Sequence, residues 1–358
     1  SDTINGVAAS PSNAILSVAP GSSVPAGLTF NTANGNVDVA PGTPAGTYSF
    51  DYQICEALNP TNCQTATITV TVEAAQITAD PDTVAGVNGA DGGPNVLNVL
   101  DGDTLNGNPV TLNEVTLTVT TPANPAAPGA PVPTLDPGTG LVSVPAGTPA
   151  GTYTITYQIC EQLNPTNCAT NTATVTVAPS PILASDDSAT GINGADGGTG
   201  VVNAFASDTI NGVAASPSNA ILSVAPGSSV PAGLTFNTAN GNVDVAPGTP
   251  AGTYSFDYQI CEALNPTNCQ TATITVTVEA AQITADPDTV AGVNGADGGP
   301  NVLNVLDGDT LNGNPVTLNE VTLTVTTPAN PAAPGAPVPT LDPGTGLVSV
   351  PAGTPAGT

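Results

Sequence analysis

Residues 48–72 read YSFDYQICEALNPTNCQTATITVTV, and this stretch decides the fold. Its two ends alternate apolar and polar residues with a period of two and are rich in aromatic and β-branched side chains, which is the pattern of half-buried β-strands. In the second strand, Ile68 and the valines point to the core and the threonines to solvent. Between the strands lies a turn bounded by Cys55 and Cys63. The sequence therefore predicts a β-hairpin with a cysteine at each side of its turn.

The hairpin is part of a long internal repeat. It returns in variant form at residues 153–177 and unchanged at residues 254–278. All residues from Ser1 to Thr152 recur unchanged as Ser207 to Thr358, a period of 206 residues. Each period contains two related copies of the hairpin, so the chain alternates two module types, A and B, each the size of one small domain.

Similar stretches begin at Ile77, Ile182 and Ile283, and we place the module junctions there. The first module then lacks its opening and the last lacks its closing strands, so we expect the chain to be a section of a longer array. The predicted modules are a truncated type A module at 1–76, a complete type B module at 77–181, a complete type A module at 182–282 and a truncated type B module at 283–358.

Turn signals separate the β-branched runs throughout the chain. They include Asn34-Gly35, Asn106-Gly107 and the Asp-Pro-Gly-Thr-Gly segment at 136–140. Their spacing is typical of all-β sandwiches, and no window shows a helical period of useful length. The predicted fold class is all-β, with tandem β-sandwich modules that form an elongated rod.

The six cysteines form three pairs at one spacing. Alternation along the strands places both cysteines of a pair on the outward face of the hairpin, so we predict three local disulfides. For so short a loop the chain-entropy model gives about 2.5 kcal/mol each. Free thiols are one alternative, and a zinc site is another that lacks the usual ligand spacing. Disulfides indicate an extracellular or cell-surface location. The predicted pairs are Cys55–Cys63, Cys160–Cys168 and Cys261–Cys269.

Composition excludes several classes of function. The chain has no Lys, Arg or His and 28 acidic residues, a formal charge of −28. Binding to a phosphate backbone depends on Lys and Arg, so nucleic acid is excluded as an ordinary partner. Anionic membrane surfaces repel such a chain, and we predict no membrane insertion in this segment.

Glutamates in the disulfide-bounded turns are the candidates for acid–base chemistry: Glu56, Glu161 and Glu262. Each recurs without a nearby His, Lys or Arg, and catalysis seldom requires identical tandem copies. We therefore predict that the chain is not an enzyme.

Three aspartate positions are shared by both module types, in the Gly- and Asn-rich opening of each module. Calcium takes oxygen ligands from such loops, and a cation there would rigidify the junctions and offset uncompensated charge. The alternative is that these residues favour turns and remain solvated. No other cofactor is predicted. The candidate calcium ligands are Asp82, Asp91, Asp103, Asp187, Asp196, Asp208, Asp288, Asp297 and Asp309.

Several motifs are similar to a known repeat. Pro-Ala-Gly-Leu-Thr-Phe at 25–30, followed by Asn34-Gly35 and Gly-Thr-Pro-Ala-Gly-Thr-Tyr at 42–48, resembles the bacterial Ig-like/cadherin-like tandem repeat of large extracellular adhesins and surface fibrils. The segment 98–107 resembles the opening of such modules. The resemblance implies Ig-like/cadherin-like sandwiches in a secreted or surface-anchored protein. The lack of Lys and Arg departs from the usual composition of these arrays.

Exact repetition, cysteine staples and strong self-repulsion favour a structural role. We predict a subunit of a long extracellular filament or cell-surface stalk. The alternative is a tandem-repeat adhesin whose modules or terminal domain bind a surface or a glycan. The expected partners are further copies of the same repeat within one chain. The alternative is pairing between chains, in which a strand from one chain completes a truncated module of another.

Overall fold

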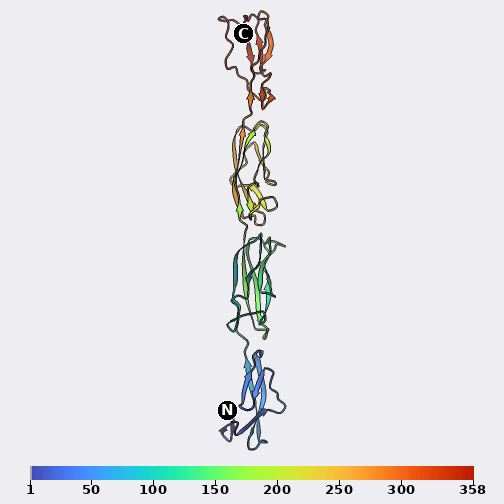
Figure 1. Cartoon of the computed structure of the whole chain (residues 1–358), viewed down its shortest axis with the longest axis vertical. Coiled ribbons are helices and arrows are strands. Elements are labelled where there is room, and N and C mark those ends of the chain that lie inside the picture. The colour runs from blue at the N-terminus through green and yellow to red at the C-terminus, as the bar shows by residue number, and fades with distance from the viewer. Residues whose placement is uncertain (1) are drawn as a thin grey trace. The chain divides into compact units, whose positions relative to one another are not determined.

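The computed structural model describes residues 2–358, and every regular element among them is a β-strand. Figure 1 shows the strands gathered into tandem β-sandwich modules, which we number 1 to 4 in chain order. Contacts divide the chain into two compact units, one of Ser1–Pro181 with Glu262–Asn268 and one of Ile182–Cys261 with Cys269–Thr358. The all-β prediction is confirmed, whereas the predicted module boundaries stay a prediction.

Module 1 consists of seven strands. Its larger sheet has the order β3-β6-β7, beside the pairs β4-β5 and β1-β2. The strands are β1 (Thr3–Ile4), β2 (Val7–Ala8), β3 (Ala14–Val18), β4 (Leu28–Asn31), β5 (Asn36–Val39), β6 (Gly46–Glu56) and β7 (Cys63–Val72).

Module 2 adds an opening strand that module 1 does not have among the described residues. This strand, β9, pairs in parallel with β17 and gives the sheet β13-β16-β17-β9, opposite the sheet β10-β15-β14. The strands are β8 (Ile77–Thr78), β9 (Asp82–Asn88), β10 (Gly93–Asn98), β11 (Thr104–Leu105), β12 (Asn108–Pro109), β13 (Val115–Thr121), β14 (Thr134–Asp136), β15 (Leu141–Val144), β16 (Gly151–Glu161) and β17 (Cys168–Ala178).

Module 3 repeats this plan, with sheets β19-β27-β26-β23 and β20-β25-β24. Its strands are β18 (Ile182–Leu183), β19 (Asp187–Asn193), β20 (Gly198–Asn203), β21 (Thr209–Ile210), β22 (Val213–Ala214), β23 (Ala220–Val224), β24 (Leu234–Phe236), β25 (Asn242–Val245), β26 (Gly252–Glu262) and β27 (Cys269–Glu279). Module 4 has two three-stranded sheets. They contain β28 (Ile283–Thr284), β29 (Gly299–Asn304), β30 (Thr310–Leu311), β31 (Asn314–Pro315), β32 (Thr340–Asp342) and β33 (Leu347–Val350).

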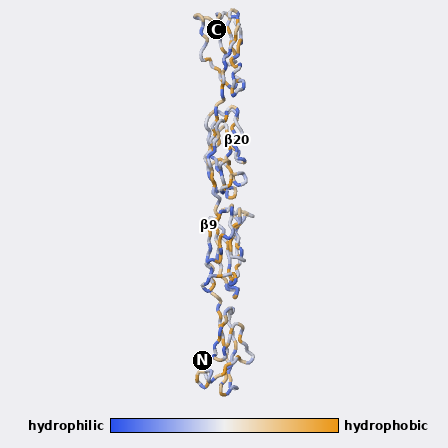
Figure 2. The backbone as a smooth tube through the Cα atoms, in the orientation of Figure 1, coloured by the Kyte–Doolittle hydropathy of each residue, from blue (hydrophilic) through white to orange (hydrophobic). Residues whose placement is uncertain are grey.

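The cores follow the alternation read from the sequence. In β27, Ile274, Val276 and Val278 are buried, and the intervening threonines lie on the other face. Figure 2 shows hydrophobic and hydrophilic residues interspersed along the backbone of each module. The predicted strand parity is therefore confirmed. Modules 2 and 3 each enclose one continuous apolar cluster between their two sheets.

Candidate functional site

The site with the most specific geometry is the junction where the disulfide-bounded turn of one module meets the module before it. Within the first compact unit this occurs twice, where modules 1 and 2 meet and where the turn of module 3 meets module 2. The turn is Glu161–Asn167 in the first case and Glu262–Asn268 in the second.

A loop of the preceding module presents a backbone N–H to this turn. In the Gly-Thr-Pro-Ala-Gly-Thr-Tyr motif, the Tyr153 hydroxyl donates to the Pro149 carbonyl at 2.8 Å and holds the loop against its own strand. The next N–H, that of Ala150, then donates to Oδ1 of Asn265 at 2.6 Å. The first junction repeats this contact, because the N–H of Ala45 donates to Asn164 Oδ1 at 2.6 Å.

The turn glutamate binds the linker that joins the modules. At the first junction, Glu161 Oε2 accepts from the N–H of Ala75 at 3.3 Å and from Asn167 Nδ2 at 2.8 Å, and that same amide donates to the Ala75 carbonyl at 2.7 Å. The next linker residue, Gln76, exchanges two hydrogen bonds with Asn106, at 2.9 and 2.7 Å. Every backbone polar group of these two linker residues therefore has a partner in module 2.

The second junction uses the equivalent glutamate, and its linker has Ser180 and Pro181 in place of Ala75 and Gln76. Glu262 accepts from both the N–H and the hydroxyl of Ser180, at 3.1 and 2.8 Å, and Asn268 Nδ2 donates to the Ser180 carbonyl at 2.8 Å. Glu262 is only 2% exposed and Ser180 3%. A carboxylate this deeply buried in a chain without cations depends entirely on hydrogen-bond donors, and here the linker supplies two of them.

Asn106 reaches the linker because of its turn. The two residues between β11 and β12 are Asn106 and Gly107, with φ of 50° and 74°. Positive φ at both positions is the type I′ geometry that Asn-Gly favours. The Asn-Gly pair read from the sequence as a turn signal is thus also a linker contact.

The structure joins the cysteines as Cys55–Cys63, Cys160–Cys168 and Cys261–Cys269. In each pair the two cysteines lie directly opposite each other across the hairpin. The expectation that they lie on an exposed face is wrong for Cys55 and Cys261, which are each 7% exposed. Each of these cysteines lies on a strand with neighbours on both sides, so the sheet covers it as well as its partner sulfur.

A second polar cluster lies inside module 2 around the Tyr157 hydroxyl. This hydroxyl is 3.0 Å from Asp82 Oδ2 and 3.4 Å from both carboxylate oxygens of Asp103, and it donates to the Asp80 carbonyl at 2.9 Å. Asp103 Oδ1 also accepts from the N–H of Asp80 at 2.7 Å. Burial raises the pKa of Asp82 and of Asp103 to about 6, and burial also raises the pKa of Tyr157.

Module 3 builds the corresponding cluster around Tyr258. Its hydroxyl lies 3.1 Å from Asp187 Oδ2 and 2.8 Å from Asp208 Oδ2. The N–H of Ser185 donates to Asp208 at 2.7 Å, and the Ser207 hydroxyl donates to Asp187 at 3.1 Å. Burial again raises the pKa of both aspartates.

The structure separates the third aspartate of each predicted calcium set from the other two. Asp91 and Asp196 lie in the turns that follow β9 and β19, at the ends of these strands remote from Asp82 and Asp187. Asp196 Oδ2 instead accepts a hydrogen bond from Asn312 at 3.4 Å.

The remaining members of the predicted calcium set lie in module 4. They are Asp288, Asp297 and Asp309, and the last of these accepts from the N–H of Asp286 at 2.8 Å. Across residues 2–358 no three acidic or cysteine side chains are grouped as a metal site requires. Calcium binding stays a prediction.

The linker contacts of the turn could not be read from the sequence. From the sequence, Glu161 and Glu262 were candidates only for acid–base chemistry. The available signal was the clustering of a Glu and two Asn in a turn held between cysteines. A turn with several side-chain acceptors and donors, fixed by a disulfide, is suited to binding backbone.

Solved structures similar to this chain include cadherin ectodomains. Protocadherin gamma B2 extracellular cadherin domains 3–6 match at 12% identity and a TM-score of 0.29, over 75% of this chain and 69% of that one. The protocadherin gamma B4 extracellular domain matches at 12% identity and a TM-score of 0.31, over 95% of this chain and 56% of that one. Mouse cadherin-23 domains 22–24 match at 14% identity and a TM-score of 0.27, over 75% and 86%.

No protein-family model and no curated protein matches the chain. The TM-scores to the cadherins are low, and the assignment of β-sandwich modules rests on the strand pairing described above. Among the described residues there is no helix with the length and apolar character needed to span a bilayer.

Proposed function

We propose that the chain is a structural subunit of a long extracellular filament or cell-surface stalk, in which the disulfide-bounded turn of each module locks the linker from the module before it. The observation that carries the proposal is the burial of Glu262 against Ser180 and of Glu161 against Ala75. The locking contact is repeated together with the module, so a uniform array acquires the same joint at each step.

Three features suit the chain to this role. The disulfide fixes the two ends of the turn, so its Glu and Asn side chains are held in place before the linker binds. The partner groups on the linker are mostly backbone, so the same Glu and Asn positions of the turn can serve both junctions. The charge of −28 keeps identical copies apart and limits aggregation of exposed strand edges.

The alternative of glycan binding has less support. The chain has 6 Tyr and 5 Phe, and all of these side chains are buried or half-buried. Phe236 packs against Phe256 and Tyr258 with ring centroids 5.4 and 6.3 Å apart. These rings belong to the core, whereas a sugar-binding platform needs an exposed aromatic face.

Electron microscopy of the full chain tests the proposal. We expect particles with narrow distributions of the bend angle at the junctions, and broad distributions in the double variant Glu161→Ala with Glu262→Ala. The matched control is Glu56→Ala, which removes the same glutamate from module 1, where no linker of the described chain lies against it. Equal distributions in the wild type and the double variant would contradict the proposal.

A further inference from the structure

The disulfides of the two module types differ in how well they are shielded from water. In module 3, Cys261 is 7% exposed, and its counterpart Cys55 in module 1 has the same value. In module 2, the corresponding Cys160 is half-buried. All three cysteines lie on a strand with a neighbour on each side, so the position in the sheet does not by itself account for the difference. A neighbouring side chain must therefore decide it.

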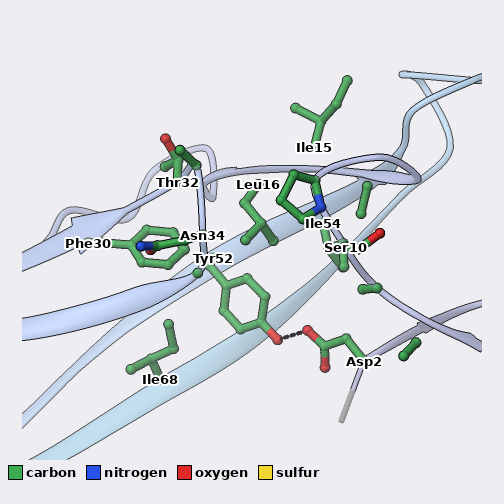
Figure 3. Close-up of a pocket in the computed structure, with 16 residues that line it drawn as sticks. Asp2, Ser10, Ile15, Leu16, Phe30, Thr32, Asn34, Tyr52, Ile54 and Ile68 are labelled. Carbon is green, nitrogen blue, oxygen red and sulfur yellow. Dashed lines mark hydrogen bonds between the residues drawn. The ribbon is translucent and has the colours of Figure 1, made fainter.

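That side chain lies directly opposite the cysteine on the adjacent edge strand. In module 1 the residue opposite Cys55 is Ile15, and Figure 3 shows Ile15 on the opposite side of its strand from the core residue Leu16. Ile221 has the same place in β23 of module 3, whereas in module 2 the residue opposite the cysteine is Thr116. Directly opposite side chains share one face of a sheet and interact. Isoleucine therefore covers the type A disulfide, and the smaller, polar threonine leaves the type B disulfide more open to water.

The second cysteine of each pair is reachable in both module types. In module 2, β9 pairs with β17 only from Ala173 onward, so no strand of the described chain lies beside Cys168 on that edge. In module 3, β19 likewise pairs with β27 only from Ile274 onward, which leaves Cys269 in the same position. Cys168 and Cys269 are both half-buried. An attacking thiolate thus meets similar sulfurs in the two module types, and the disulfides differ in the sulfur that would leave.

The leaving sulfur decides how fast a disulfide exchanges. A cysteine leaves faster when its thiolate is better stabilised. Burial among apolar groups disfavours a thiolate, so Cys261 beneath Ile221 is a poor leaving group. Cys160, half-buried beside Thr116, leaves into contact with water. The type B disulfide is therefore the one suited to exchange.

We propose that Cys160–Cys168 is a site of thiol–disulfide exchange with a small thiol, and that its reduction loosens the first junction while the second stays locked. A thiolate attacks Cys168 Sγ, the sulfur–sulfur bond breaks, and Cys160 leaves with the electron pair and takes a proton from water. A second thiolate attacks the mixed disulfide and releases Cys168, so two small thiols are oxidised to one disulfide and the protein gains two thiols. The turn Glu161–Asn167 then loses the bond across its base. The effect on the junction rests on the proposed function, in which this turn holds the linker.

The charge of the chain restricts which thiol reacts. With 28 acidic residues and no Lys, Arg or His, the protein repels an anionic thiol, so the site favours a small thiol that is neutral or carries an amine. At low salt and equal thiolate concentration, cysteamine should reduce the disulfide faster than mercaptopropionate, and the two rates should converge as salt rises. Equal rates at low salt would overturn this choice of thiol.

Limited reduction of the full chain, followed by alkylation of the freed thiols, tests the site. The two types of cysteine peptide differ in mass, because Gln162 of type B replaces an alanine of type A. The type B cysteines should be alkylated about tenfold faster than the type A cysteines. Equal rates for the two types would overturn the proposal.

Reciprocal substitutions identify the shielding residue. Thr116→Ile should slow the type B reaction to the type A rate. The double variant Ile15→Thr with Ile221→Thr should raise the type A reaction to the type B rate. All three side chains are exposed, so the variants keep their cores. Rates that do not move in either variant would overturn the proposal.

Hydrogen exchange in the selectively reduced chain reads the two junctions separately. The N–H of Ala75, which donates to Glu161 at the first junction, should exchange several-fold faster, and the N–H of Ser180 at the second junction should be unchanged. Selective reduction without a change at Ala75 would overturn control of the junction by this disulfide. Failure of the proposed function itself would appear instead in Glu161→Ala, which would then leave the exchange of Ala75 unchanged while the disulfide is intact.

Discussion

Residues 56–62 and 262–268 have the same sequence, yet they lie in different surroundings. In module 3 the turn is buried against module 2, with Glu262 2% and Asn265 8% exposed. In module 1 the turn is open, and Leu58 is 89% exposed. Glu56 accepts from Asn62 at 3.1 Å within its own turn, and hydrogen bonds from Asn59 and Asn62 lower its pKa. The turn is therefore preformed, and the linker only adds donors to it.

The same difference extends into the cores of the two copies, and it should give the largest effect. Ile260→Ala removes a fully buried side chain and should destabilise module 3 by about 3 kcal/mol, whereas Ile54→Ala removes its half-buried counterpart in module 1 and should cost about 1 kcal/mol. Hydrogen exchange of the amides of β27 and β7 reads the two modules separately, which a single melting curve of a multi-domain chain does not. Equal losses would mean that Ile54 is as deeply buried in solution as Ile260.

The turns themselves give the next largest effect. Glu262→Ala leaves the N–H and the hydroxyl of Ser180 without their acceptor and should weaken the junction by about 2 kcal/mol. The amides of Ala150 and Ser180 should then exchange faster by more than tenfold. Glu56→Ala, the same change in the open copy, should leave the stability of module 1 nearly unchanged. If both substitutions have the same effect, the turn acts within its own hairpin and not on the linker.

The contrast between these turns shows where sequence reasoning stops. Alternation along β7 and β27 was sufficient to place Ile68 and Ile274 on the core side, because strand parity is a local property. The contact between Asn265 and Ala150 joins residues 115 positions apart. It depends on how a loop and a turn from two modules meet, and neither motif carries that information alone. The predicted grouping of the aspartates was limited for the same reason. Their shared sequence positions did not reveal that the length of β9 separates Asp82 from Asp91.

Calcium should affect the stability of modules 2 and 3 differently from that of module 1. If the aspartates of modules 2 and 3 bind calcium, a concentration ten times the dissociation constant should stabilise these modules by about 1.4 kcal/mol. Among the described residues, module 1 has Asp2 as the counterpart of Asp208 but no counterpart of Asp187. Its stability should therefore not change with calcium. Thermal melting with calcium and with a chelator, followed by hydrogen exchange, measures this. Superimposable melting curves with calcium and with the chelator would contradict calcium binding.

A fall in pH from 7 toward 4 should raise the stability of modules 2 and 3. The folded-state pKa of Asp82 and of Asp103 is about 6, above the ordinary value of 3.8. The folded state therefore binds protons more tightly than the unfolded state, and stability rises as the pH falls from 7 toward 4. The gain between pH 7 and pH 5 should be about 1 kcal/mol for each carboxyl group. Asp103→Asn should flatten the pH dependence of module 2, and an unchanged dependence would place its origin elsewhere.

The smallest effect concerns the serine that takes the place of Ala75 at the second junction. At the first, Asn164 Nδ2 donates to Glu161 Oε1 at 2.7 Å. At the second, the Ser180 hydroxyl takes the corresponding oxygen, and Asn265 Nδ2 is left as a buried atom without a hydrogen-bond partner among the described residues.

Ser180→Ala should release Glu262 Oε1 to Asn265, so that one hydrogen bond replaces another. The net change should be within about 0.5 kcal/mol, far less than the loss of a buried hydroxyl whose partner finds no substitute. The double variant Ser180→Ala with Asn265→Ala removes the replacement donor and should cost about 1 kcal/mol more than Asn265→Ala alone, the matched control, which also lacks the acceptor of the Ala150 N–H. Hydrogen exchange of the Asn268 and Ala150 backbone amides would measure whether the hydrogen bond from Asn265 to Glu262 has formed. A large loss in the single variant would show that the junction cannot rearrange, and that each of the two junctions is fixed to its own linker sequence.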